Sequence, residues 1–73
     1  MPEKIIWKIQ YINLCISEFA RKQRLSPQLA YRYLMTYQGL AFLDSNYEAE
    51  HTLALQDTME SLKKICRRNG GCL

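Results

Sequence analysis

The single histidine is the first residue in this chain that could do chemistry. His51 follows two carboxylates, Glu48 and Glu50, and histidine is the most frequent general acid or base in enzymes. Such a residue needs a nucleophile or a paired carboxylate at a recognisable spacing, and the sequence offers neither. We therefore expect His51 to be structural, donating to a carbonyl or capping a helix, and we predict that the protein is not an enzyme.

The three cysteines are the other candidates for chemistry. A structural zinc site needs four nitrogen or sulfur ligands, and Cys15, Cys66 and Cys72 with one histidine are a poor set at this spacing. Gly70 and Gly71 follow a predicted helix rather than a strand, so they are not a phosphate-binding loop. We predict no catalytic residue, no metal site and no cofactor.

Length and composition favour one small domain. The chain has 73 residues, of which 48% are hydrophobic, and a chain of this size buries only about 60% of its unfolded surface. Because small domains often gain stability from a partner, we expect apolar surface to be left over for association. Lys8, Gln10 and Asn13 interrupt the first apolar stretch, so we predict neither a signal peptide nor a membrane span, and a cytoplasmic protein with reduced thiols.

The hydrophobic pattern predicts an all-α fold, a compact bundle of about four helices. We expect helices over residues 3–23, 27–38, 40–47 and 53–68, an irregular connection over 48–51 and a frayed tail over 69–73. The last helix should face inward with Leu55, Met59, Leu62 and Cys66.

Five residues predict where these helices begin and end. Pro2 suits a first helical turn. Ser26 is the expected N-cap of the second helix, with Pro27 at its first position. Gly39 should end that helix in the left-handed conformation, and Thr52 should cap the last helix.

The first helix carries an unusually wide apolar face. Ile5, Ile9, Ile12 and Ile16 follow helical spacing, and further apolar residues broaden the stripe. This breadth predicts burial against more than one neighbour. Trp7 lies on the other side, where it either covers the end of the core or anchors an association.

Aromatic residues concentrate between residues 31 and 47. Tyrosine suits interface hot spots, and it equally suits a core edge where its hydroxyl reaches solvent, so both interpretations stay open. Tyr47 and His51 are four residues apart and would share a face of a helix. The candidate partner-binding residues are Trp7, Tyr33, Tyr37, Tyr47 and His51.

Charge is unevenly distributed along the chain. Residues 1–32 hold six basic and two acidic groups, residues 33–62 hold five acidic groups and no Lys or Arg, and residues 63–73 hold four basic groups and no acidic one. The turn at Gly39 superficially resembles a helix-turn-helix. The helix that would enter the DNA groove, however, carries Asp44 and Glu48 and no Lys or Arg. Nucleic-acid binding is therefore disfavoured, and only the basic flanks support it.

Several motifs together resemble a known family. They are Leu25-Ser26, Ala30 in the following helix, Gly39 before an apolar pair, Phe42-Leu43, Tyr47-x-x-x-His51-Thr52 and a final amphipathic helix. From Ile9 to Ile65 the chain is similar to short bacterial proteins known as domain of unknown function 3791. The resemblance implies a small all-helical protein without assigned activity, encoded near ADP-ribosyltransferase-like proteins as an antitoxin or accessory protein. Members often carry an apolar residue directly before the histidine, where this chain has Glu50.

These observations predict a non-enzymatic protein-interaction module. Its partner would be another protein or a second copy in a homodimer. The alternative function is a small nucleic-acid-associated regulator that uses the basic flanks.

Overall fold

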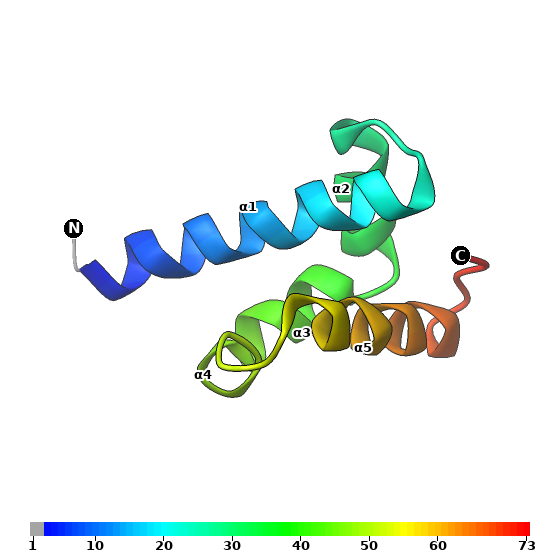
Figure 1. Cartoon of the computed structure of the whole chain (residues 1–73). Helices are drawn as coiled ribbons and strands as arrows, with labels where there is room; N and C mark the ends of the chain where they lie inside the picture. Colours follow the sequence, from blue (N-terminus) through cyan, green and yellow to red (C-terminus); the bar gives the residue numbers. More distant parts are fainter. Residues whose placement is uncertain (1–2) are drawn as a thin grey trace.

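The computed structural model describes residues 3–73, which form helices and no strand. The helices are α1 Glu3–Gln23, α2 Pro27–Thr36, α3 Gly39–Ser45, α4 Tyr47–Glu50 and α5 Leu55–Arg68. Figure 1 shows α1 crossing above α3, α4 and α5, with α2 beside its C-terminal half. The predicted all-α fold is confirmed. Pro2, expected in the first turn, lies outside the described residues.

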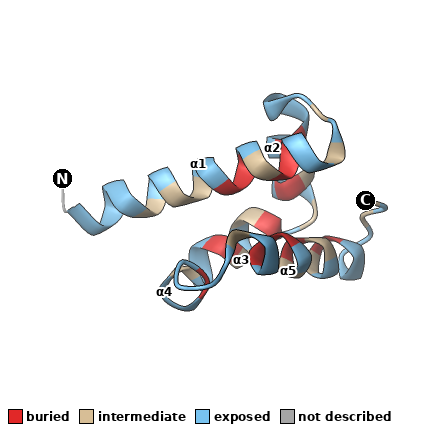
Figure 2. Cartoon of the chain, in the orientation of Figure 1, coloured by how far each residue is buried: buried red, intermediate tan, exposed pale blue. Residues whose placement is uncertain are grey.

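The core is concentrated at one end of α1. Phe19 of α1, Leu34 of α2, Leu43 of α3 and Leu62 of α5 are almost fully buried against one another. Figure 2 shows the buried residues of α1 confined to its C-terminal half. The inward-facing residues predicted for the last helix lie in or against this core, namely Leu55, Met59, Leu62 and Cys66.

The N-terminal half of α1 is exposed, which corrects the prediction that its apolar stripe is buried by several neighbours. Ile5 and Ile9 continue the stripe of Ile16 but are exposed. The reason is length. A 21-residue helix spans about 30 Å, close to the longest dimension of the molecule, 35 Å, whereas the other helices are shorter and pack chiefly near its C-terminal half.

The link between α2 and α3 differs from the prediction. Gln38, not Gly39, adopts the left-handed conformation, with φ of 70°. Gly39 is instead the buried first residue of α3. A Cβ atom there would lie 2.7 Å from Leu34 Cδ2 and 3.2 Å from Cys66 Sγ, so this glycine is needed for the close approach of three helices.

After residue 45 the observed helix boundaries differ from the predicted ones. Residues 47–50 form the short helix α4 rather than an irregular connection. Thr52 does not cap α5, because its hydroxyl donates to the Ala49 carbonyl (2.7 Å), and the N-cap is Ala54 without a side-chain hydrogen bond. The cap of α2 is as predicted: Ser26 Oγ accepts from the amide of Leu29 at 3.2 Å.

The tail after α5 forms hydrogen bonds to α5 and α2, and fraying of residues 69–73 stays a prediction. The amides of Gly70 and Gly71 donate to the carbonyls of Arg67 (3.2 Å) and Cys66 (2.8 Å), the pattern of a Schellman motif. The amide of Leu73 then donates to the Tyr33 hydroxyl at 2.9 Å. The tail is therefore tied to α2.

Two substitutions at adjacent positions test the link between α2 and α3. Gly39→Ala should lower the free energy of unfolding by about 1–3 kcal/mol, because the added methyl group overpacks buried Leu34. Gln38→Gly should leave it unchanged or raise it by up to ~1 kcal/mol, because glycine adopts positive φ without strain. Urea unfolding followed by circular dichroism measures both. A loss of stability in Gln38→Gly as large as that in Gly39→Ala would contradict this assignment.

Candidate functional site

The five candidate residues lie in three separate places. Tyr47 and His51 do meet: their rings stack with centroids 4.5 Å apart and planes at 15°. His51 Nδ1 lies 2.7 Å from the Tyr47 carbonyl oxygen, and because a carbonyl can only accept, Nδ1 carries the proton. The predicted hydrogen bond from His51 to a carbonyl is therefore present, while a purely structural role for His51 stays a prediction.

Tyr47 also connects α4 to α1. Its ring meets that of Tyr11 edge to face, with centroids 5.5 Å apart, and the Tyr11 hydroxyl lies 3.2 Å from Thr58 Oγ1 on α5. Burial raises the pKa of Tyr11 to about 12 and also raises the pKa of the Cys15 thiol, which is fully buried. Both groups are therefore neutral at physiological pH, and Cys15 is an inert core residue.

Glu50 is the polar residue that reasoning from sequence missed. Its side chain is 8% exposed, and its Oε1 atom has no hydrogen-bond partner within residues 3–73. One signal could have revealed it, because Glu50 stands directly before His51, where the family resemblance implies an apolar residue. The buried position is thus one that an apolar side chain would suit.

Tyr33 and Tyr37 lie at the opposite end of the molecule from Tyr47. The Tyr33 ring stacks on Phe19 with centroids 5.7 Å apart, and it meets the tilted ring of Tyr37 at 4.8 Å. Because the Tyr33 hydroxyl also holds Leu73, this pair has the geometry of a core edge. Contact with a partner through these two residues stays a prediction.

Trp7 lies on an exposed part of α1. Its side chain is 53% exposed, as is that of Leu14 seven residues later, which places both on the side of the helix away from the core. Trp7 is also outside the aromatic pairs found within residues 3–73. We call the five exposed residues of this part of the helix the α1 apolar surface: Ile5, Ile6, Trp7, Ile9 and Leu14.

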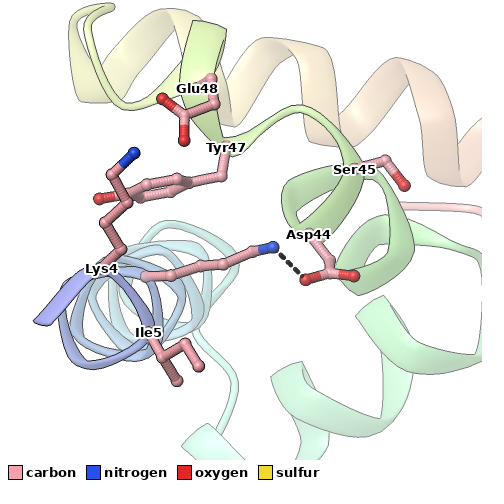
Figure 3. A pocket seen from close by; sticks show the side chains of 7 residues that line it. Lys4, Ile5, Asp44, Ser45, Tyr47 and Glu48 are labelled. Atoms are coloured by element: carbon pink, nitrogen blue, oxygen red, sulfur yellow. Dashed lines mark ion pairs between the residues drawn. The ribbon is translucent and has the colours of Figure 1, made fainter. Parts of the chain in front are cut away.

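Two hollows adjoin α1, one near its N-terminus and one farther along the helix. One, of about 370 Å³, lies between α1 and the α3–α4 corner. Figure 3 shows the ring of Tyr47 pointing toward α1 there, and an ion pair of 2.6 Å joins Lys8 Nζ to Asp44 Oδ1. The other is a groove of about 560 Å³ between α1 and α2, lined by Ile16, Tyr31 and Met35 among others.

The basic residues near the C-termini of α1 and α5 lie at one end of the molecule. Figure 1 shows α1 and α5 running in the same direction, so the basic residues near their C-termini are at the same end. Two of these residues have partners within the chain: Arg21 pairs with Glu18, and Arg67 Nε donates to the Leu73 carbonyl at 3.2 Å.

Within residues 3–73 the His, Cys, Asp and Glu side chains form no group of three that could hold a metal ion. None of the helices described there has the length and apolar character needed to cross a membrane.

The buried position of Glu50 yields a stability test. Glu50→Met should raise the free energy of unfolding by about 1–3 kcal/mol, because it replaces a buried carboxylate that has an unpartnered oxygen. Glu48→Met removes the same charge from an exposed neighbour and should change stability by at most ~0.5 kcal/mol. Thermal unfolding of both variants compares them. Destabilisation by Glu50→Met would show that its carboxylate is satisfied in solution.

The chain matches a family of known proteins. A family model described as Protein of unknown function (DUF3791) matches residues 10–69. Curated proteins and solved structures gave no match. The match spans α2 to α5 and all of α1 from Gln10 onward, including Tyr47 and His51. Because it covers most of the chain, the protein belongs to the DUF3791 family of proteins of unknown function.

Proposed function

We propose that this protein is a non-enzymatic protein-interaction module that binds another protein, or a second copy of itself, through the α1 apolar surface. The observation that supports the proposal is five large apolar side chains exposed within residues 5–14. Burying one such side chain contributes about 1.5–3 kcal/mol. Exposed apolar residues that cluster on one element mark an interaction site more often than scattered single ones do.

The arrangement of these residues favours a partner that surrounds α1 on more than one side. Ile5 and Ile9 continue the core-facing stripe, whereas Trp7 and Leu14 lie on the opposite side. Tryptophan is enriched among the residues that dominate binding energy, which makes Trp7 the expected anchor.

The N-terminal half of α1 has few supports within its own chain. The specific ones found in the described residues are the ion pair of Lys8 with Asp44, the ring contact of Tyr11 with Tyr47, and the hydrogen bond between the Tyr11 and Thr58 hydroxyls. A partner would therefore stabilise a helix that the rest of the fold leaves uncovered. In its finer form, taken from the family resemblance, the proposal is that the partner is an ADP-ribosyltransferase-like protein and that this chain is its antitoxin or accessory protein.

One observation supports the alternative, a nucleic-acid-associated regulator. Because α1 and α5 run in the same direction, Lys22 and Arg24 lie at the same end of the molecule as Lys64 and Arg68. Phe42 and Ile65 lie in a small hollow beside Lys64 and Arg68. A cluster of basic side chains near an aromatic ring can bind a single-stranded nucleic acid.

The interaction proposal predicts a defined loss on substitution of α1. At micromolar concentration the wild-type chain should either exceed its monomer mass of 8.6 kDa in light scattering or retain a stoichiometric partner in a pull-down. Ile6→Gln combined with Trp7→Gln should abolish that association and leave the helical circular dichroism spectrum unchanged, because both residues are exposed. Leu53→Gln is the matched control, since Leu53 is similarly exposed but belongs to the segment between α4 and α5. A monomeric wild type without any partner would contradict the proposal.

The alternative predicts binding that depends steeply on salt. Single-stranded DNA should be retarded in a gel at low salt and released as salt increases, because phosphate contacts release counterions. Lys64→Glu combined with Arg68→Glu should remove the retardation. If the wild-type chain retards no nucleic acid even at low salt, the alternative is excluded.

A further inference from the structure

The groove between α1 and α2 is separate from the residues that define the α1 apolar surface. Ile16 of α1 lies at its base, and Tyr31 and Met35 line its α2 side. These two side chains are 46% and 51% exposed, although they sit beside the buried core residues Ala30 and Leu34. The α1–α2 groove is thus an apolar surface that the chain itself leaves open.

The shape of this groove suits a helix. Tyr31 and Met35 are four residues apart and follow one another along the same face of α2. The groove between two packed helices is the surface that receives the apolar face of a third helix in many complexes. Methionine adapts to irregular apolar surfaces, and tyrosine offers an apolar ring with a polar tip.

Charge determines what kind of helix fits. Residues 13–36 contain four bases (Arg21, Lys22, Arg24, Arg32) and one acid (Glu18), so their net charge is 4 − 1 = +3. Glu18 is already paired with Arg21. Arg32 lines the groove itself and forms no ion pair within residues 3–73. An occupant with acidic flanks would complement this charge.

A second copy of the chain does not provide such an occupant. Its own α1–α2 layer carries the same positive charge and would be repelled. Its acidic part, residues 44–60, exposes one large apolar side chain, Leu53, among the described residues. That part therefore cannot supply an apolar face as long as the groove.

We propose that the α1–α2 groove binds an amphipathic helix of another protein, with apolar side chains against Ile16, Tyr31 and Met35 and acidic side chains against Arg32. The inference rests on the proposed interaction function and specifies the chemistry of the partner. Ile9 precedes Ile16 by two helical turns on the same face of α1, so a helix longer than the groove would extend toward the α1 apolar surface.

The test uses two synthetic peptides of equal length. Both have leucine at helical spacing; one has glutamate and the other lysine at the flanking positions. Fluorescence anisotropy should show saturable binding of the glutamate peptide that weakens as salt increases. The lysine peptide should bind at least about tenfold more weakly. Equal binding of the two peptides, or no binding of either, would overturn the inference.

Matched variants locate the binding. Arg32→Glu should weaken binding of the glutamate peptide by about tenfold and strengthen that of the lysine peptide. Arg68→Glu makes the same change of charge at an exposed position of α5. It should change the binding of neither peptide. Met35→Glu should abolish binding without loss of helicity, since Met35 is half exposed. An equal effect of Arg32→Glu and Arg68→Glu would overturn the inference.

Nuclear magnetic resonance separates this inference from the proposed function. On addition of the glutamate peptide, the amide signals of Asn13, Ser17, Gln28 and Tyr31 should shift. Shifts confined to α5 would overturn the inference. Should neither peptide bind while Ile6→Gln with Trp7→Gln still abolishes association, the groove assignment fails and the interaction function stands.

Discussion

The packing of the C-terminal half of α1 against α2, α3 and α5 is the interaction on which the rest of the structure depends. Phe19 is almost fully buried there and stacks on Tyr33, while Cys15 and Ala20 let the neighbouring helices approach. Because α3 and α5 are short, they cover only part of a 21-residue helix. The N-terminal half of α1 then remains outside the core, and its apolar side chains face solvent as a consequence of this mismatch in length.

Close packing and backbone strain occur at neighbouring residues in the link between α2 and α3. The close contact of Gly39 with Leu34 and Cys66 leaves no space for a side chain at that position. The left-handed conformation between α2 and α3 is adopted by the preceding residue, Gln38, and Arg24 adopts it after α1. Both cost about 1–2 kcal/mol relative to glycine, which core packing must offset.

Much of the fold could be predicted from the sequence because its signals are local. Helical periodicity and the cap at Ser26 depend on residues within a few positions of one another, and they predicted α1, the start of α2 and the inner face of α5. The function of Gly39 could not be predicted this way, since the atoms that exclude a side chain there belong to Leu34 and Cys66, the latter on a different helix. The same holds for the tail, which depends on a hydrogen bond between residues 33 and 73.

In the candidate site, too, contacts between nearby residues could be predicted, whereas features that depend on the packing of separate helices could not. The contact of Tyr47 with His51 follows from a spacing of four residues on a helix, and the sequence predicted it only for the case that these residues are helical. The exposure of Ile5 and Ile9 could not be predicted, because a wide apolar stripe does not specify how much of it the other helices cover. Burial of Glu50 likewise depends on how α4 packs.

The central claim is that the chain's own fold leaves the N-terminal half of α1 uncovered. Trp7 is the only tryptophan, so its fluorescence reports on this region alone. In dilute protein without a partner, acrylamide should quench Trp7 efficiently, because its side chain is exposed. The quenching constant should be at least roughly half that of free tryptophan. A blue-shifted emission that acrylamide does not quench at the lowest measurable concentration would show that the chain itself covers Trp7, and would contradict the account.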